Sequence, residues 1–193
     1  MKFNQWFPDC IGDELLTNVD NKKLKKYCLT LKKSKQGKFA SYSNTWQSHN
    51  LDIRSPILKE LIIEFEKNLF HFKDILGVKN KLNFKVSNLW VNINGKGAMH
   101  RPHLHVGSIL SGIYYISVPK NSGNTCFSNP NLFAFNCLPK NAYEKYTINN
   151  SSEVFYELID SKLLIFPSHL LHYVFPNKSN QNRITISFTS FLV

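Results

Sequence analysis

The hydrophobic positions of the first 80 residues repeat with the spacing of helices. From Asp13 to Lys33, apolar residues recur three and four positions apart, which predicts a helix with a lysine-rich outer face. A second helix is expected between Ser55, a candidate N-cap followed by Pro56, and Gly77, which would end it. One broad apolar stripe along this second helix is expected to pack against the back of a sheet: Ile57, Leu58, Leu61, Ile62, Phe65, Leu69, Phe72 and Ile75.

The segments beside these helices lack such a repeat. Residues 3–11 are predicted to form a short strand or an extended lead-in, broken at Pro8. Residues 32–52 are polar and poor in aliphatic side chains, which predicts an extended loop. Trp46 in this loop is interpreted first as a packing residue, with contact to a substrate as the alternative.

From residue 81 onward the period changes to two, which indicates strands. Residues 81–94 alternate, and a break at Ser87 and Asn88 predicts a bulge between the apolar positions Phe84, Val86, Leu89, Val91 and Ile93. Turn signals separate seven further predicted strands, at residues 104–106, 109–118, 125–128, 154–159, 162–166, 171–175 and 183–192.

Helices followed by many short antiparallel strands predict a mainly β fold with flanking helices, a double-sheet jelly roll. At 193 residues with 42% hydrophobic content, the chain is expected to form one domain. In this prediction residues 1–80 supply the lead-in and helical support, and residues 81–193 form the jelly-roll core.

The composition of the chain limits where the protein is expected in the cell and what it is expected to bind. No apolar run approaches the roughly 20 residues that cross a bilayer, and the start lacks the apolar core of a signal peptide. We therefore expect a cytoplasmic protein without a membrane partner. Four cysteines are widely spaced, at positions 10, 28, 126 and 137, which favours buried or incidental thiols over disulfides. The net charge of +11 is interpreted as solvated surface lysine rather than a dedicated polyanion site.

Three histidines open the stretch MHRPHLHVGSILSGIYY, at positions 100, 103 and 105. On an extended chain residues two apart point to the same face, so His103 and His105 are expected to share one metal ion. A third candidate ligand, His172, lies 67 residues further on, and Arg183 follows eleven residues later. This pattern predicts a non-haem iron site with an anionic co-substrate.

Five segments carry a resemblance to a known family. HRPHLHVGSILSGIYYISVP, CFSNP, LLIFPSHLLHYVFPN, RITISF and the upstream NTWQSHNLD resemble motifs of the Fe(II)- and 2-oxoglutarate-dependent oxygenases, the double-stranded β-helix enzymes. Within that superfamily the chain is most similar to a family of small 2OG-Fe(II) oxygenases found in marine bacteria and phages.

The resemblance implies a role for each matching residue. His103, His105 and His172 would hold Fe(II), leaving coordination positions for 2-oxoglutarate and O2. Most of the superfamily has a carboxylate where this chain has His105, so the iron here would carry more positive charge. Arg183 would bind the distal carboxylate of 2-oxoglutarate. Thr185, Asn92 and Asn94 are further implied contacts with the co-substrate. Tyr114 or Tyr115 would add another donor, since only one of two neighbouring strand residues can face inward; Tyr114 is taken as that donor. Tyr115, Trp46 and His100 are taken as substrate contacts, with a substitute metal ligand as the alternative for His100.

The implied reaction is hydroxylation of a prolyl residue or a small metabolite, so the expected partner is a small-molecule or peptide substrate. Three alternatives stay open: a cupin-like three-histidine dioxygenase or metal-binding jelly roll without 2-oxoglutarate, a nucleic-acid demethylase, and a non-catalytic jelly-roll module. The apolar C-terminal sequence FTSFLV is also expected to be able to pair across a homodimer interface.

Overall fold

The computed structural model describes residues 1–2, 8–38, 44–131 and 140–193. Most of the strands in this part of the chain belong to a six-stranded antiparallel sheet, called the major sheet. Its strand order is β1 (Gly12–Leu15), β8 (Lys162–Pro167), β5 (Leu110–Ser117), β10 (Arg183–Leu192), β3 (Phe84–Asn94) and β2 (Thr45–Gln47).

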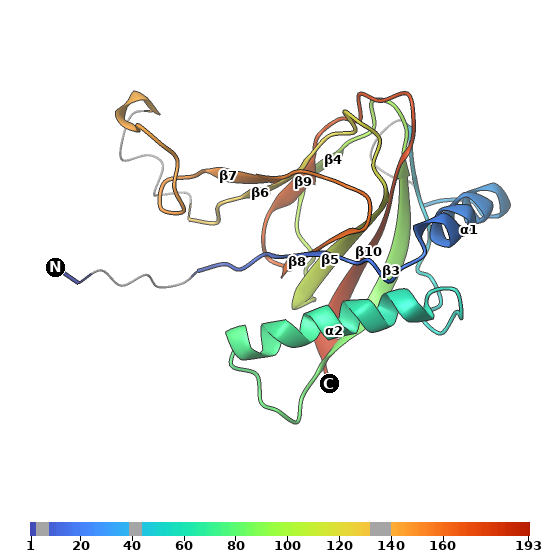
Figure 1. Cartoon of the computed structure of the whole chain (residues 1–193), viewed down its shortest axis with the longest axis horizontal. Coiled ribbons are helices and arrows are strands. Elements are labelled where there is room, and N and C mark those ends of the chain that lie inside the picture. The colour runs from blue at the N-terminus through green and yellow to red at the C-terminus, as the bar shows by residue number, and fades with distance from the viewer. Residues whose placement is uncertain (3–7, 39–43, 132–139) are drawn as a thin grey trace.

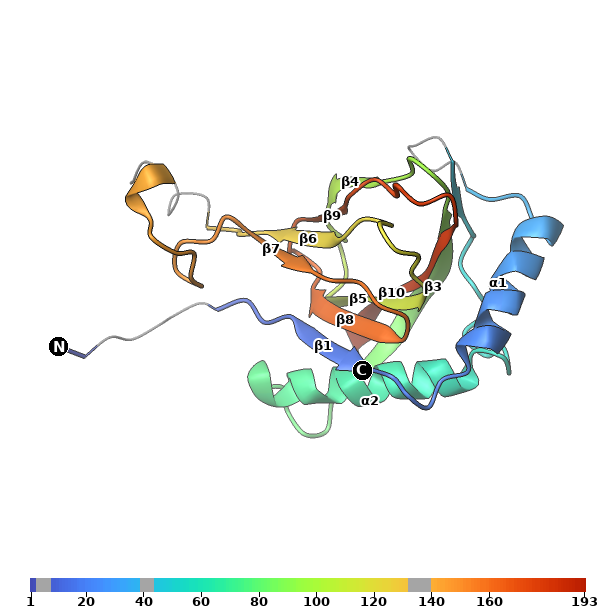
Figure 2. The ribbon, with the colours of Figure 1, turned by 45° about the horizontal axis from the view of Figure 1, so that its top comes forward.

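A four-stranded antiparallel sheet, called the minor sheet, lies over the major sheet (Figure 2). Its strand order is β4 (His100–His103), β9 (His172–Val174), β6 (Thr125–Ser128) and β7 (Glu153–Tyr156), and the short helix η2 (Lys140–Ala142) precedes β7. Two facing antiparallel sheets with helices outside confirm the predicted jelly roll, a double-stranded β-helix.

Both long helices flank the major sheet: α1 (Asn21–Ser34) and α2 (Lys59–Ile75) (Figure 1). The apolar stripe of α2 is buried at Leu61, Phe65 and Leu69, in one cluster with Leu89 and Phe188 of the sheet. This confirms that α2 packs against the back of the sheet, and burial of such side chains contributes about 1.5–3 kcal/mol each.

The first helix begins later than predicted. Residues 12–15 form the edge strand β1, which pairs with β8, and the helix starts at Asn21. The carboxylate of Asp20 accepts a hydrogen bond from the backbone N–H of Lys23, 3.0 Å away, and so caps the helix. A strand this short is decided by its partner in the sheet, which local periodicity does not contain.

The second helix also begins later than predicted, while its end was predicted correctly. The Leu58 N–H donates to the Ser55 carbonyl at 2.9 Å, forming a turn, and α2 starts at Lys59 with no side-chain cap. At the other end Gly77 has a φ of +63°, the left-handed conformation that ends helices. Ser55 is therefore not the N-cap.

The bulge predicted in the first long strand is present. In the pairing of β3 with β10, Asn88 lies opposite Thr189 but Val86 lies opposite Ser190, so Ser87 is the extra residue. The bulge moves Phe84 and Val86 onto the face that carries Leu89, and all three are buried in the cluster beneath α2.

One prediction for the N-terminal region needs correction, and another is reduced from a strand or an extended lead-in to the lead-in alone. Within the predicted loop of residues 32–52, Thr45–Gln47 form strand β2, an edge of the major sheet beside β3. Residues 8–11 form no strand, and residues 3–7 lie outside the described residues. Cys10, Cys28 and Cys126 are free thiols, as predicted, and Cys137 lies outside the described residues.

The structure does not support the pairing of β10 across a dimer interface that the sequence suggested. It lies between β5 and β3, which occupy both of its edges from Ile184 to Ser190, and Leu192 still pairs with Phe84. Neither helix of the described part of the chain is long and apolar enough to cross a membrane.

We predict that Gly112→Ala lowers the free energy of unfolding by about 1–3 kcal/mol, the usual cost of overpacking a core. A Cβ at this position would overlap the ring of Phe188, which is stacked on Phe65 with 4.4 Å between ring centroids. Urea unfolding measures the change.

The control is Gly112→Ala in a Phe188→Leu background, where the overlapping ring atoms are absent and the cost should shrink. An equal loss in both backgrounds would show that the contact with Phe188 is not the cause.

Candidate metal centre

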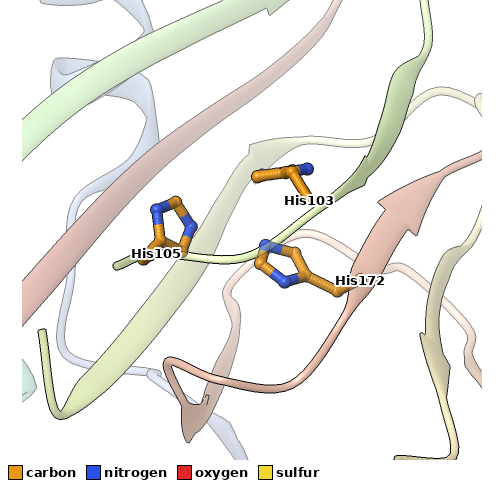
Figure 3. Close-up of side chains that lie close together, drawn as sticks. All are labelled: His103, His105 and His172. Carbon is orange, nitrogen blue, oxygen red and sulfur yellow. The ribbon is translucent and has the colours of Figure 1, made fainter. Parts of the chain in front are cut away.

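Three histidines meet between the two sheets (Figure 3). His103 ends strand β4 and pairs across the minor sheet with His172 of β9, while His105 lies two residues beyond the strand. One ring nitrogen from each of the three lies within 4.8 Å of the others. The ring centroids of His103 and His172 are 4.2 Å apart, and that of His105 is 5.3 and 5.1 Å from theirs.

The strand beneath these histidines is not the predicted one. Residues 104–106 form no strand, and the paired segment is His100–His103. His105 instead donates its backbone N–H to the Ser168 carbonyl at 2.9 Å, in the turn before His172. The three side chains therefore converge through this turn contact rather than through one strand face.

Backbone carbonyls orient two of the imidazoles. Nδ1 of His103 lies 2.7 Å from the Arg101 carbonyl oxygen, and Nδ1 of His172 lies 2.9 Å from that of Leu170. A carbonyl accepts but does not donate, so each Nδ1 carries the proton and each Nε2 keeps its lone pair. This is the arrangement of metal-binding histidines, whose second nitrogen donates to a carbonyl or carboxylate.

Burial keeps two of the candidate ligands neutral. Desolvation, with the neighbouring His103, lowers the pKa of His105 to about 4 and that of His172 to about 3. At neutral pH both rings therefore offer a lone pair to a metal ion without first losing a proton.

His100 stands apart from the other three histidines. Its Nε2 lies 3.1 Å from Nδ2 of Asn94, and its ring centroid is 6.4 Å from that of His103. Burial and the charge of Arg183 lower its pKa to about 4. His100 lines the cavity beside the metal centre but is not in the group whose nitrogens could share an ion.

The histidines open into a cavity of about 530 Å³ that also contains Arg183. The Arg183 side chain is 1% exposed. Its Nη1 donates to the carbonyls of Ser122 and Gly123, and its Nη2 is buried and makes no hydrogen bond to any residue that the structure describes. Burial lowers its pKa to about 10, so the guanidinium remains charged at neutral pH. A buried cation with an unused donor is strongly unfavourable unless an anion pairs with it.

Polar groups surround Arg183 on the floor of the cavity. The hydroxyl of Tyr115 lies 2.5 Å from Thr125 Oγ1, and burial raises its pKa to about 12, so it remains protonated. Thr185 and Asn92 line the same cavity and pair across β10 and β3. These groups can donate hydrogen bonds to a carboxylate held by Arg183.

Two predicted contacts lie elsewhere. Tyr114 faces the helices, where its hydroxyl donates to Oδ1 of Asn21 at 2.8 Å, because neighbouring strand residues point to opposite faces. Tyr115 takes its place in the cavity. Trp46 packs against the main core cluster and is not among the residues that line the cavity, which favours the packing interpretation.

Several cavity residues were not predicted. They lie on the inner face of the major sheet: Gln47, Asn88, Trp90, Ser187 and Thr189. In the sequence, most of them could be found only from polar residues that recur at every second position of a strand. Of the polar positions on the same strands, the sequence motifs indicated only Asn92, Asn94, Arg183 and Thr185.

A jelly roll with three clustered histidines and a buried arginine defines a class of metal-dependent enzyme, and comparison with known proteins identifies the family. The family model described as "Putative 2OG-Fe(II) oxygenase" matches residues 88–189, more than half of the chain. The chain therefore belongs to this family, as the sequence motifs predicted. Fe(II) is its metal, and 2-oxoglutarate and O2 are its co-substrates. No curated protein matches the chain.

Solved structures confirm the fold at low sequence identity. A prolyl-4-hydroxylase from Pseudomonas putida is 12% identical over 93% of this chain and 91% of its own, with a TM-score of 0.64. HygX from Streptomyces hygroscopicus, with nickel, 2-oxoglutarate and hygromycin B bound, is 13% identical over 93% and 82%, with a TM-score of 0.61. A Trichoplax adhaerens prolyl hydroxylase in complex with a peptide is 19% identical over 95% and 83%, with a TM-score of 0.63.

We predict that the metal-free protein loses stability as the pH falls from about 6.5 through about 4. Burial lowers the pKa values of His100, His105 and His172 to about 4, 4 and 3, whereas an unfolded histidine titrates near 6.5. The unfolded chain therefore binds more protons than the folded chain in this range, so acid favours unfolding.

Urea unfolding of chelator-treated protein at pH 7.5, 6 and 5 measures this dependence. The His172→Gln variant lacks one of these groups and should lose less stability over the same interval. A variant that loses as much as the parent chain would show that the buried imidazoles do not cause the dependence.

Proposed function

We propose that the chain hydroxylates a C–H bond of its substrate at the three-histidine centre. The observation that carries this proposal is the unpaired Nη2 of buried Arg183, which shares one cavity with the three histidines. Bound Fe(II) supplies the activation of O2 that couples decarboxylation of 2-oxoglutarate to substrate oxidation. One oxygen atom of O2 enters succinate, formed together with CO2, and the other enters the substrate as a hydroxyl group.

The protein's contribution is to hold and orient these reactants. The Nε2 atoms of His103 and His172, with a nitrogen of His105, would hold the metal. Nη2 of Arg183 would donate to the distal carboxylate of 2-oxoglutarate. Thr185, Asn92 and Tyr115 would be further hydrogen-bond donors to it. Tyr115 replaces Tyr114 in this role because Tyr115 lines the cavity. Positioning of this kind lowers the entropic part of the activation barrier.

The charge balance of the cavity supports 2-oxoglutarate as the partner of the metal. Among the described residues that line the cavity there is no aspartate or glutamate. Many iron oxygenases instead hold the metal with two histidines and a carboxylate. Neutral imidazoles would leave the two positive charges of Fe(II) uncompensated. Together with the Arg183 cation, the site would then carry three positive charges. A dianionic co-substrate offsets two of these, so metal and 2-oxoglutarate should bind more tightly together than separately.

Arg183 also separates this proposal from the alternatives that lack 2-oxoglutarate. A cupin-like dioxygenase or a metal-binding jelly roll without 2-oxoglutarate would leave the buried guanidinium without an anion. The proposed substrate is a prolyl residue or a small metabolite, and the similarity to prolyl hydroxylases is one of fold.

We also propose that residues 1–193 form a single domain, because β1 and β2 join the first 80 residues to the major sheet.

Anaerobic titration with Fe(II) and then 2-oxoglutarate tests the proposal. A weak visible charge-transfer band should appear only when both are present. Succinate should form on admission of O2.

We predict that Arg183→Lys weakens 2-oxoglutarate binding about tenfold to a hundredfold, while Fe(II) binding persists. An ammonium cannot reproduce the forked contact, and a hydrogen bond to a charged group contributes about 1.5–3 kcal/mol. Titration of the band at fixed Fe(II) gives the dissociation constant of 2-oxoglutarate.

The matched control is Arg54→Ala, because Arg54 is a surface arginine paired with Asp52 at 3.1 Å and should not affect the titration. Iron binding without any band, or an Arg183→Lys variant with unchanged affinity, would contradict the proposed role of 2-oxoglutarate and favour the cupin-like alternative.

A further inference from the structure

Strands β3 and β10 present mostly polar side chains to the cavity along its whole length. Four residues of β3 face inward, each opposite a polar residue of β10: Asn94 opposite Arg183, Asn92 opposite Thr185, Trp90 opposite Ser187 and Asn88 opposite Thr189. At about 3.3 Å per residue, these four pairs extend over roughly 20 Å.

The four pairs divide into two parts with different tasks. Arg183, Thr185 and Asn92 form the part assigned above to 2-oxoglutarate. The pairs of Trp90 with Ser187 and of Asn88 with Thr189 are called here the distal floor. The ring of Trp90 lies 5.6 Å from that of His105, so the distal floor begins beside the metal centre.

Hydrogen bonds hold the polar side chains of the distal floor in place. Nδ2 of Asn88 donates to Thr189 Oγ1 at 3.1 Å and, at the mouth, Nδ2 of Asn50 donates to Asn88 Oδ1 at 2.8 Å. Nδ2 of Asn92 donates to Ser187 Oγ at 3.1 Å. A hydroxyl that accepts an amide proton can still donate its own, so Ser187 has a proton to offer to a ligand.

The charges of the cavity exclude one large group of substrates. Because aspartate and glutamate are absent from its described lining, an ammonium or guanidinium substrate would enter without a counter-ion. Beyond Arg183, the lining has one further lysine or arginine, the exposed Lys38. The described lining therefore offers no partner to a cationic substrate and, once Arg183 holds 2-oxoglutarate, only the exposed Lys38 to an anionic one. We expect an uncharged substrate that is rich in hydrogen-bonding groups.

We propose that the distal floor binds a neutral saccharide, with the C–H face of one sugar ring on Trp90 and its hydroxyls on Asn88, Ser187 and Thr189. An indole offers a flat apolar surface, and amides and hydroxyls both donate and accept, which is what a sugar ring presents in return. This inference rests on the proposed function, because it names the substrate of the same centre.

The distal floor is poorly suited to a peptide or a nucleic acid. An extended peptide gains affinity from main-chain hydrogen bonds to a free strand edge. Along the distal floor β3 pairs with β10 on one edge. On the other edge, the carbonyls of Leu89 and Val91 already accept hydrogen bonds from backbone N–H groups of residues 48–51. Single-stranded nucleic acid needs a cationic groove and repeated stacking surfaces, and the distal floor has one indole. The cavity volume of about 530 Å³ lies within the range of about 300–1,000 Å³ typical of small-molecule sites.

The test is a glycan array probed with the full chain loaded with Ni(II) and 2-oxoglutarate, which does not require turnover. Neutral glycans such as maltotriose, cellotriose, mannotriose and N,N′-diacetylchitobiose are compared with the cationic kanamycin and a proline-rich peptide. At least one neutral glycan should bind. Its dissociation constant in solution, measured by calorimetry, should rise at least tenfold in Trp90→Ala.

Two further variants make the result specific. Thr189→Val keeps the shape of the side chain and removes its hydroxyl, so the affinity for the same glycan should fall several-fold. Phe155→Ala removes an aromatic side chain that is 52% exposed on the minor sheet, away from the cavity, and should bind as the parent chain does.

Absence of binding to every neutral glycan, or binding unchanged in both Trp90→Ala and Thr189→Val, would overturn the saccharide proposal. Selective binding of kanamycin or of the peptide would overturn it as well. The proposed function fails by a different result, namely no Arg183-dependent binding of 2-oxoglutarate, so the two failures are distinguishable.

Discussion

The antiparallel pairing of β10 with β3 is the constraint on which both the core and the site depend. From residue 183 to 189, odd positions of β10 carry polar side chains into the cavity, and the even positions Ile184, Ile186 and Phe188 are buried beneath the helices. Residues 88–94 of β3 alternate in the same way. Because the side-chain period is two, a slip of one residue would bury Arg183 against α2 and expose the core face to the cavity. The register thus fixes the hydrophobic core and the polar floor together.

The metal centre needs the second sheet as well. His103 and His172 come from opposite ends of the jelly-roll sequence, and their pairing between β4 and β9 brings their rings to 4.2 Å. Carbonyls of the same two segments fix the Nδ1 protons, so the backbone that builds the sheet also selects the tautomer. The metal centre is therefore assembled by strand pairing and by the turn contact of His105 with Ser168.

Sequence patterns predicted the features that depend on local spacing. The bulge at Ser87 and the limits of β10 follow from alternation along the chain. The three histidines were chosen correctly as one group, but their convergence depends on the pairing of β4 with β9 and on the turn contact of His105. Features set by a distant partner were missed: β1 becomes a strand because β8 pairs with it, and Tyr114 faces α1 while Tyr115 faces the cavity because β5 aligns with β10. The alternation of a strand predicts that Tyr114 and Tyr115 point to opposite faces of the sheet. Only the three-dimensional structure shows which of the two faces the cavity.

Arg183 shows how function is maintained at a cost to the folded chain. Its guanidinium is buried with one nitrogen unpaired, a state that destabilises the protein unless an anion is bound. The carbonyls of Ser122 and Gly123 hold its other nitrogen, so the side chain is already oriented before a ligand arrives. A ligand that binds the folded chain stabilises it, and a co-substrate carboxylate would remove the penalty at the same place. The unfavourable burial of Arg183 is then the source of affinity, because the unused donor favours a carboxylate over water.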